Sequence, residues 1–266
     1  MKTLQLSNIS LSYTDNEGTG QPILLIHGNS SSGETFKNQM GSDSYKIVAI
    51  DLPGHGNSDR FPDLSHYNMP GYAEVIAEAA KELNMEDAVL VGWSLGGHIA
   101  LEAVKLLPKL KGVVIYGTPP LAFPPAMEDA YFPHPAMGVG FAADITEEQA
   151  IAYADAFFSE GTTAPHQPFL DDILKTDGNA RAGLAASIVP DGYEDEIKIV
   201  ESMATPLAIL QGSNEQLVNP NYLKSLNIPA LWRGEVQIVD NAGHAPHWEN
   251  ADSFNKMLFE FVEDVK

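Results

Sequence analysis

The sequence has 266 residues, 44% of them hydrophobic, with a formal net charge of −21 at pH 7 and no cysteine. This length suits one large α/β domain with room for an inserted subdomain. The acidic balance argues against nucleic acid or an anionic membrane as a partner, because both call for basic patches. The lack of cysteine excludes disulfides and thiolate metal sites.

Residues 1–8 hold no continuous apolar core of the kind that a signal peptide has. No run elsewhere approaches the ~20 apolar residues of a membrane span. We therefore expect a soluble, cytoplasmic protein that needs no cofactor. The sequence leaves open whether it is a monomer or a dimer.

Apolar runs alternate with amphipathic runs along most of the chain. Runs typical of strands are 3–7 and 9–13, expected as an edge hairpin, then 22–27, 46–51, 88–91, 112–116, 206–211 and 236–240. Helical spacing occurs near 33–40, over 70–83, from 95 to 107, over 145–158 and 169–174, and over 254–262. Strands that alternate with helices predict a mostly parallel, eight-stranded sheet with helices on both faces.

One long segment interrupts this alternation. Between residues 121 and 187 no strand-like run occurs, and prolines and aromatic residues gather there. We predict that 121–187 forms a helical cap, inserted after the sixth strand and lying over the ends of the strands. Residues 1–120 and 188–266 then make up the core of the fold.

The segment after the fifth strand-like run has the pattern G-x-S-x-G, as Gly92-Trp93-Ser94-Leu95-Gly96. Set between a β-type run and an amphipathic run, this pattern predicts a nucleophile elbow, with the serine on a sharp strand-to-helix turn. Gly92 and Gly96 supply the small neighbours that the turn needs, and the helix N-terminus points its partial positive charge at the serine. The alternative is a glycine-rich turn that happens to contain a serine.

A serine nucleophile needs a base, which enzymes with this elbow carry after the last strand. His244 is the best candidate, because it follows the run 236–240 on a glycine-bearing loop. The alternative is a histidine of a surface loop. His27 and His55, which border glycine turns, are expected to hold loops by hydrogen bonds.

The base in turn needs an orienting carboxylate, expected on the loop after the seventh strand-like run. Asn214 stands where many such enzymes have aspartate, and an amide cannot balance the charge of an imidazolium, so Glu215 is the predicted acid. Asp240 competes because it lies close to His244 in sequence, although we expect it to be structural. The loop after the sixth run, another acid position in such enzymes, holds no carboxylate.

The oxyanion that forms on a substrate carbonyl needs two fixed hydrogen-bond donors. The N–H of Leu95, directly after Ser94, is one candidate, and the N–H of Asn29, in the loop 27–33, is the other. The side-chain amide of Asn29 is expected to face the same pocket. The alternative reading of 27–33 is an anion-binding turn, but it lacks the pattern G-x-x-x-x-G-K-S/T of a phosphate-binding loop.

With these elements in place, the chain resembles the α/β hydrolases over its entire length, and within them the metal-independent N-acyl-homoserine lactonases. Such lactonases carry Asp-Glu where this chain has Asn214-Glu215, so the resemblance also places the acid on Glu215. The motifs that carry it are His27-Gly28-Asn29-Ser30-Ser31-Ser32-Gly33, Asp51-Leu52-Pro53-Gly54-His55-Gly56, Gly92-Trp93-Ser94-Leu95-Gly96-Gly97-His98-Ile99, Gly117-Thr118-Pro119-Pro120 and Asp240-Asn241-Ala242-Gly243-His244-Ala245-Pro246.

The resemblance implies hydrolytic opening of the lactone ring of N-acyl-homoserine lactones, which is quorum quenching. Ser94 would attack the ring carbonyl with His244 as base, giving an acyl-enzyme. Asn29, Trp93 and Tyr153 are the expected substrate contacts, with Tyr153 on the lactone ring or, alternatively, in the core of a cap helix. Five cap aromatics are expected to line an acyl-chain tunnel or to form a small core of the cap: Phe123, Phe132, Phe141, Phe157 and Phe158.

Three other functions compete with this one. A general carboxylesterase of the same fold would take simple esters, with the lactone as a minor substrate. A non-catalytic receptor would only bind a small-molecule signal, which an intact set of Ser94, Glu215 and His244 argues against. A metal-dependent lactonase would need an H-x-H-x-D-H cluster, which the sequence lacks, so we expect no metal site.

Overall fold

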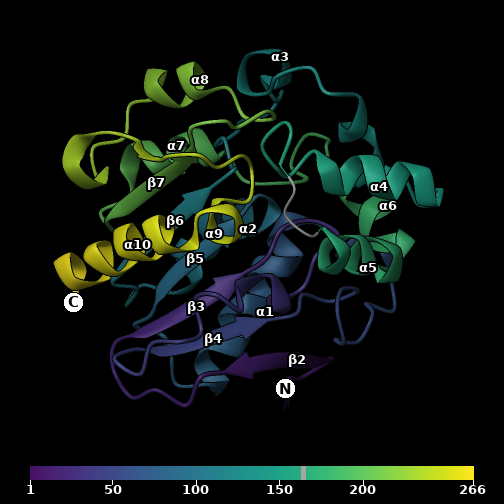
Figure 1. Ribbon diagram of the computed structural model, residues 1–266. Helices are drawn as coiled ribbons and strands as arrows, with labels where there is room; N and C mark the ends of the chain where they lie inside the picture. Colours follow the sequence, from purple (N-terminus) through teal and green to yellow (C-terminus); the bar gives the residue numbers. More distant parts are fainter. Residues whose placement is uncertain (163–165) are drawn as a thin grey trace.

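The computed structural model describes residues 1–162 and 166–266 (Figure 1). In these residues an eight-stranded sheet has the order β1-β2-β4-β3-β5-β6-β7-β8. Pairing is antiparallel between β1 and β2 and between β2 and β4, and parallel elsewhere. The strands are β1 Lys2–Gln5, β2 Ser10–Asp15, β3 Pro22–Ile26, β4 Lys46–Ile50, β5 Val89–Trp93, β6 Gly112–Tyr116, β7 Leu207–Gly212 and β8 Gln237–Val239. The predicted mostly parallel sheet is confirmed.

Helices cover both faces of this sheet. The α-helices are α1 Met69–Glu82, α2 Leu95–Ala103, α3 Met127–Ala130, α4 Glu147–Asp155, α5 Gln167–Lys175, α6 Gly178–Ala186, α7 Glu196–Ser202, α8 Pro220–Ser225, α9 Pro246–Glu249 and α10 Ala251–Val265. Short 3₁₀ helices are η1 Gly33–Phe36, η2 Leu64–His66, η3 Val104–Leu106, η4 Pro135–Phe141 and η5 Trp232–Gly234. Within the described residues, no helix has both the length and the apolar character needed to cross a bilayer.

The central strands are apolar on both sides because each side is covered. Successive side chains of a strand point to opposite faces. Leu24 and Ile26 of β3 pack into one core with α1 and α2, whereas Ile23 and Leu25 pack into the other with α10. This two-sided burial explains why these strands read as unbroken apolar runs.

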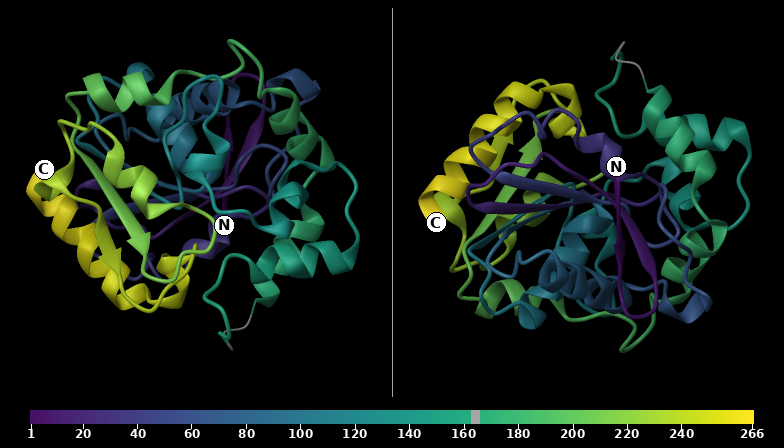
Figure 2. Two further views of the ribbon diagram at one scale, coloured as in Figure 1. Left: turned by 90° about the horizontal axis from the view of Figure 1, so that it is seen from above. Right: turned by 90° about the horizontal axis from the view of Figure 1, so that it is seen from below.

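Between β6 and β7 the chain leaves the sheet, and its described residues form helices and one isolated bridge, Tyr131 to Val218, but no strand, as predicted for a cap inserted after the sixth strand. Figure 1 and Figure 2 show α4, α5 and α6 gathered on the opposite side of the molecule from the yellow α10. The structure adds α6 and α7, which the sequence pattern did not reveal, and shortens the helix expected near 33–40 to the 3₁₀ turn η1. The division at residues 121 and 187 stays a prediction.

A buried glutamate ties α2 to the segment before α7. Glu102 is 1% exposed, and one of its carboxylate oxygens accepts a hydrogen bond from the Glu194 N–H at 3.0 Å. Its other oxygen, Oε2, has no partner among the described residues. Burial raises the pKa of the Glu102 carboxyl to about 8, since a charged group loses its hydration there.

This shift predicts a pH-dependent stability. Between the ordinary pKa of 4.5 and the folded pKa of about 8, the folded chain holds a proton that the unfolded chain has released. The contribution of Glu102 to the free energy of unfolding is therefore fully present below pH 4.5 and is lost as the pH rises through 8. The free energy of unfolding falls by up to ~1.4 kcal/mol per pH unit in this range. Glu102→Gln should gain stability relative to wild type between pH 5 and pH 8.5 in urea-unfolding experiments. Glu74→Gln, on the exposed face of α1, is the control. If the free energies of unfolding of Glu102→Gln and of wild type change with pH in the same way, the assignment is wrong.

Candidate active site

Ser94 occupies the turn between β5 and α2 in a strained backbone conformation. Its φ of 53° and ψ of −118° lie where a residue with a side chain is rarely found. Its N–H donates to the Tyr116 carbonyl at 2.9 Å, and its carbonyl accepts from the Thr118 hydroxyl at 2.8 Å and from the Gly97 N–H at 2.9 Å. The end of β6 therefore holds the turn, so that the Ser94 hydroxyl points out of the sheet into a pocket.

Two glycines make this turn sterically possible. A Cβ atom at Gly92 would lie 2.2 Å from the Gly96 carbonyl oxygen, and one at Gly96 would lie 2.1 Å from the Ile26 carbonyl oxygen. Both contacts are with backbone, which cannot move aside without breaking the sheet or the helix. The small residues of the G-x-S-x-G pattern are therefore required by the close approach of α2 to β3 and β5.

His244 and Glu215 form a buried pair beside this turn. The His244 Nδ1 lies 2.9 Å from Glu215 Oε2, and both side chains are only 3% exposed. The other oxygen of Glu215 accepts from the Leu217 N–H at 2.8 Å, which fixes the carboxylate. An ionised carboxylate can only accept, so Nδ1 carries the proton and Nε2 is the basic ring nitrogen. Gly117 leaves room for the ring, because a Cβ there would lie 2.6 Å from His244 Cε1.

Neither Asn214, which stands at the position of the usual aspartate, nor the competing acid Asp240 reaches the imidazole. Asn214 is exposed, and its side-chain nitrogen lies 3.4 Å from the Ser159 hydroxyl. Asp240 is also exposed, and its backbone carbonyl accepts from the Asn250 amide at 2.7 Å. Of the two candidate acids, Glu215 and Asp240, only Glu215 bonds to His244 in the described part of the chain.

Trp93 requires a correction, because the structure places it below the pocket. Its side chain is 0% exposed, and its indole N–H donates to the His244 backbone carbonyl at 2.8 Å. The ring packs edge-to-face against Phe157 and Phe169. Trp93 therefore positions the histidine loop and does not face a substrate.

Asn29 lies on the pocket wall, in a loop that a buried histidine holds in place. The Leu52 N–H donates to His27 Nε2 at 2.9 Å, so His27 Nδ1 is protonated and donates to the Gly28 carbonyl at 2.7 Å. Burial lowers the pKa of His27 to about 4, which keeps the ring neutral. His55 likewise bonds the Pro53 carbonyl at 3.0 Å, so both histidines hold loops as expected.

Asn29 and Leu95 line the same pocket as Ser94. In residues 1–162 and 166–266 neither residue's backbone N–H donates to another protein group, which leaves both for a ligand. The Asn29 side-chain amide, in contrast, donates to the Gly140 carbonyl in η4 at 2.6 Å. The amide expected to serve the pocket is therefore committed to the cap.

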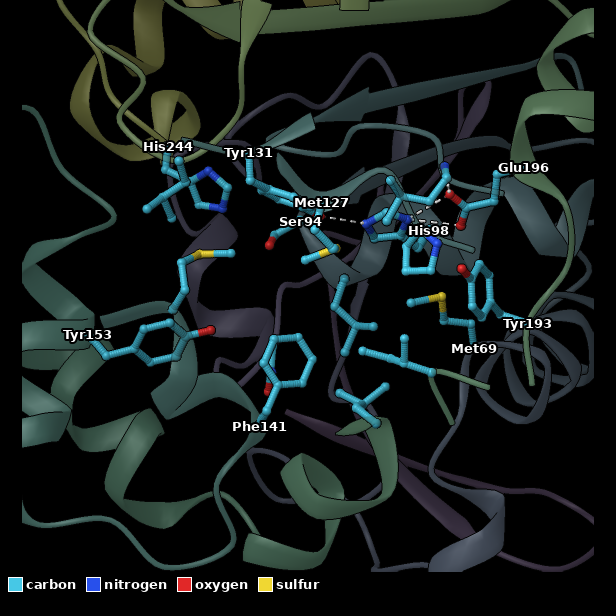
Figure 3. Close-up of a pocket in the computed structure, with 18 of the residues that line it drawn as sticks. Met69, Ser94, His98, Met127, Tyr131, Phe141, Tyr153, Tyr193, Glu196 and His244 are labelled. Atoms are coloured by element: carbon cyan, nitrogen blue, oxygen red, sulfur yellow. Dashed lines mark hydrogen bonds and ion pairs between the residues drawn. The ribbon is translucent and has the colours of Figure 1, made fainter. Parts of the chain in front are cut away.

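The pocket lies between the strand ends and the cap (Figure 3). Tyr153, on α4, is 7% exposed, and its hydroxyl points into the cavity, as does the ring of Phe141. Other residues of the wall are Met69, His98, Leu121, Met127, Tyr131, Met137, Phe157, Leu184, Ile188, Tyr193, Glu196 and Leu217. The wall is mainly apolar, which suits a small organic ligand with an apolar part.

The tunnel expected from five cap phenylalanines is only partly formed. Phe141 and Phe157 line the pocket. Phe123 and Phe132 are 43% and 39% exposed and lie outside it, and Phe158 is fully buried against Phe169 and His166. Sequence spacing did not separate these positions, because α4 ends at Asp155 and the neighbours Phe157 and Phe158 lie in the turn after it, one lining the pocket and the other buried against Phe169 and His166.

The structure adds a polar pair that the sequence did not reveal. His98 and Glu196 line the far end of the pocket and bond to each other. The usable signal was that His98 follows Ser94 by only four positions, on the first turn of α2. Nothing local marks Glu196 as its partner. Among the described residues, no group of three or more His, Asp or Glu side chains is placed to bind a metal ion.

Comparisons with known proteins agree with this fold. The alpha/beta hydrolase family matches residues 23–257, and the chain belongs to that family. The protein is therefore a hydrolase.

Its relatives include esterases, a lactonase and peroxidases. A crystal structure of a variant of N-acyl homoserine lactonase AidH, complexed with N-hexanoyl homoserine lactone, is 33% identical, covers 100% of this chain and 98% of its own, and has a TM-score of 0.94. The pimeloyl-(acyl-carrier protein) methyl ester esterase of Stenotrophomonas maltophilia (strain R551-3) is 28% identical over 92% of this chain and 94% of its own. An esterase of Thermogutta terrifontis, 20% identical over 100% of this chain and 99% of its own with a TM-score of 0.83, shares the fold.

The bond from Trp93 to the His244 carbonyl can be tested by Trp93→Phe. Loss of one hydrogen bond is worth ~1 kcal/mol, so kcat for p-nitrophenyl acetate should fall roughly fivefold while KM stays unchanged. Trp232→Phe is the matched control, because the Trp232 indole N–H donates to Asp264 at 2.9 Å, away from the pocket. A higher KM with unchanged kcat would instead mean that Trp93 contacts the substrate.

Proposed function

We propose that the protein is a serine hydrolase that opens the lactone ring of N-acyl-homoserine lactones through an acyl-enzyme. One observation carries the proposal: the Ser94 hydroxyl and the imidazole held by Glu215 face one apolar pocket, beside two unpartnered N–H groups. The full-length similarity to an N-acyl homoserine lactonase, at a TM-score of 0.94, favours the lactone as substrate. Removal of such a signal would be quorum quenching.

In the first half-reaction, Ser94 Oγ attacks the ring carbonyl while His244 Nε2 takes the hydroxyl proton. The Glu215 carboxylate holds the imidazole in the correct tautomer and stabilises the imidazolium. The N–H groups of Leu95 and Asn29 bind the oxyanion, each worth ~3–4 kcal/mol in the transition state. The ring C–O bond then breaks, and the imidazolium gives its proton to the ring oxygen, which becomes the free hydroxyl of the opened homoserine.

In the second half-reaction, water attacks the ester that links the opened chain to Ser94. His244 Nε2 takes a proton from this water, and the same two N–H groups bind the new oxyanion. Collapse of the intermediate breaks the bond to Ser94 Oγ, which recovers its proton from the imidazolium. The product is N-acyl-homoserine, and the enzyme returns to its starting state.

Tyr153 is the proposed contact to the lactone ring. Its hydroxyl faces the cavity and has no hydrogen-bond partner among the described residues. Burial raises the pKa of this phenol above its ordinary value, so the hydroxyl stays protonated and can donate. A general carboxylesterase is the second candidate, which the similarity to a methyl ester esterase favours.

A substrate panel separates these two functions. We expect purified protein to hydrolyse N-hexanoyl homoserine lactone with a kcat/KM at least tenfold above that for methyl hexanoate, because the pocket offers polar groups to the ring and an apolar wall to the chain. Chromatography should detect N-hexanoyl-homoserine as the product, and Ser94→Ala should abolish its formation. Faster cleavage of the simple ester would make the protein a carboxylesterase.

The acid is tested by a pair of charge-neutralising substitutions. Glu215→Gln should lower kcat by orders of magnitude, up to the ~10⁴-fold loss seen when a triad carboxylate is removed from a serine protease. Asp240→Asn should change kcat little, because Asp240 is exposed and does not bond to His244. Circular dichroism of both variants checks the fold. A dead but folded Asp240→Asn, with Glu215→Gln near normal, would show that the acid is Asp240.

A further inference from the structure

A second imidazole–carboxylate pair lies at the end of the pocket opposite Tyr153 (Figure 3). His98 Nδ1 lies 2.9 and 2.8 Å from the two carboxylate oxygens of Glu196. The side chains are 6% and 0% exposed, and Glu196 also accepts from the Leu121 N–H at 2.8 Å. Because an ionised carboxylate can only accept, His98 Nδ1 carries a proton.

His98 Nε2 is therefore the ring nitrogen left for a ligand. Its one partner in the described chain is the Tyr131 hydroxyl at 3.4 Å, which is a long and weak contact. The pocket that this nitrogen lines is mainly apolar, and its wall includes Met69, Leu121, Met127, Leu184 and Ile188. A polar atom in such a wall discriminates between ligands, because only a ligand with a matching polar group satisfies it.

The position of His98 defines where on a substrate that group would lie. Ser94 directly precedes α2 and His98 lies four positions later, so helix geometry places their Cα atoms about one helical turn, roughly 6 Å, apart, and both residues line the pocket. In an N-acyl-homoserine lactone, acyl carbon 2 lies ~3.8 Å from the ring carbon that bears the nitrogen, as Cα atoms do across a trans amide. The reacting carbonyl and acyl carbon 3 add one bond each, which gives roughly 6 Å between them.

We propose that His98, held by Glu196, is a specificity-determining residue that hydrogen-bonds an oxygen substituent on carbon 3 of the acyl chain. A singly protonated ring accepts from a 3-hydroxyl group, and a doubly protonated ring donates to a 3-oxo group. The favoured substrates are then 3-oxygenated N-acyl-homoserine lactones. This inference rests on the proposed function and adds the class of acyl chain to it.

The same pair also ties α2 to α7, so a purely structural role has to be distinguished. A structural tie would change the turnover of all lactones by the same factor. A binding role changes the ratio of kcat/KM between an oxygenated and a plain acyl chain of equal length. That ratio is therefore the measurement to make.

For wild-type protein, kcat/KM is compared for N-hexanoyl, N-(3-oxohexanoyl) and N-(3-hydroxyhexanoyl) homoserine lactone. We expect at least one oxygenated substrate to be favoured about fivefold, the value of one hydrogen bond. His98→Leu combined with Glu196→Gln should remove this preference, because the oxygen then meets an apolar wall. The amide oxygen of the second substitution still accepts from the Leu121 N–H, which protects the fold.

Two single variants complete the set. His98→Gln keeps a side-chain amide and should retain part of the preference, while Tyr131→Phe removes only the weak competitor for Nε2 and should preserve it. Loss of activity on all three lactones by one factor, with the ratio unchanged in the double variant, overturns the proposal. If the double variant does not fold, the wild type and Tyr131→Phe still test the proposal. Equal kcat/KM for the three lactones in both proteins would overturn the role of His98.

The outcome also separates this inference from the proposed function. Lactones that are hydrolysed at equal rates would leave the lactonase intact and remove the role of His98. Lactones that are not hydrolysed would remove the lactonase. In that case the readout becomes inhibition of p-nitrophenyl acetate hydrolysis by the lactones. Tighter inhibition by the oxygenated lactones that disappears in the double variant supports the subsite. Equal inhibition by all three lactones overturns it.

Discussion

The site depends on how closely α2 approaches the sheet at the end of β5. Gly92 and Gly96 allow backbone to meet backbone there, at distances that no side chain could share. The turn between them is strained at Ser94, and its strain is held by hydrogen bonds from the end of β6. Such strain persists only where the surroundings over-determine it. As a result, a rigid turn carries the Ser94 hydroxyl, which faces the pocket, and the adjacent residue Leu95, which lines it.

Hydrogen bonds between residues far apart in the sequence bring His244 and Glu215 to this turn. The His244 loop rests on the indole N–H of Trp93, a residue 151 positions earlier and next to the nucleophile. Glu215 holds the other side of the ring from the loop after β7, and Gly117 leaves the space that the ring fills. Three loops at the ends of parallel strands thus meet in one place, where an open α/β sheet commonly binds its ligands.

Much of this could be predicted from sequence because it is encoded locally. The unbroken apolar runs predict strands covered on both faces, and Gly92 to Gly96 predict the elbow, since the close contact there needs small residues in fixed positions. The features missed from sequence depend on partners far along the chain. Trp93 faces a carbonyl that no pattern marks, and Glu196 meets His98 only because α7 folds against α2. The small residues of α6 give no apolar stripe, so its helix was invisible.

The bond between the Asn29 side chain and the Gly140 carbonyl joins the oxyanion loop to the cap. Gly140 belongs to η4, and a side chain there would collide with the Tyr153 hydroxyl 2.6 Å away, so cap, ring contact and oxyanion loop share one small volume. A movement of η4 would strain or break the hydrogen bond from Asn29, the residue whose N–H is proposed to bind the oxyanion. A substrate that displaces η4 would therefore act, through this one hydrogen bond, on a residue of the proposed oxyanion site.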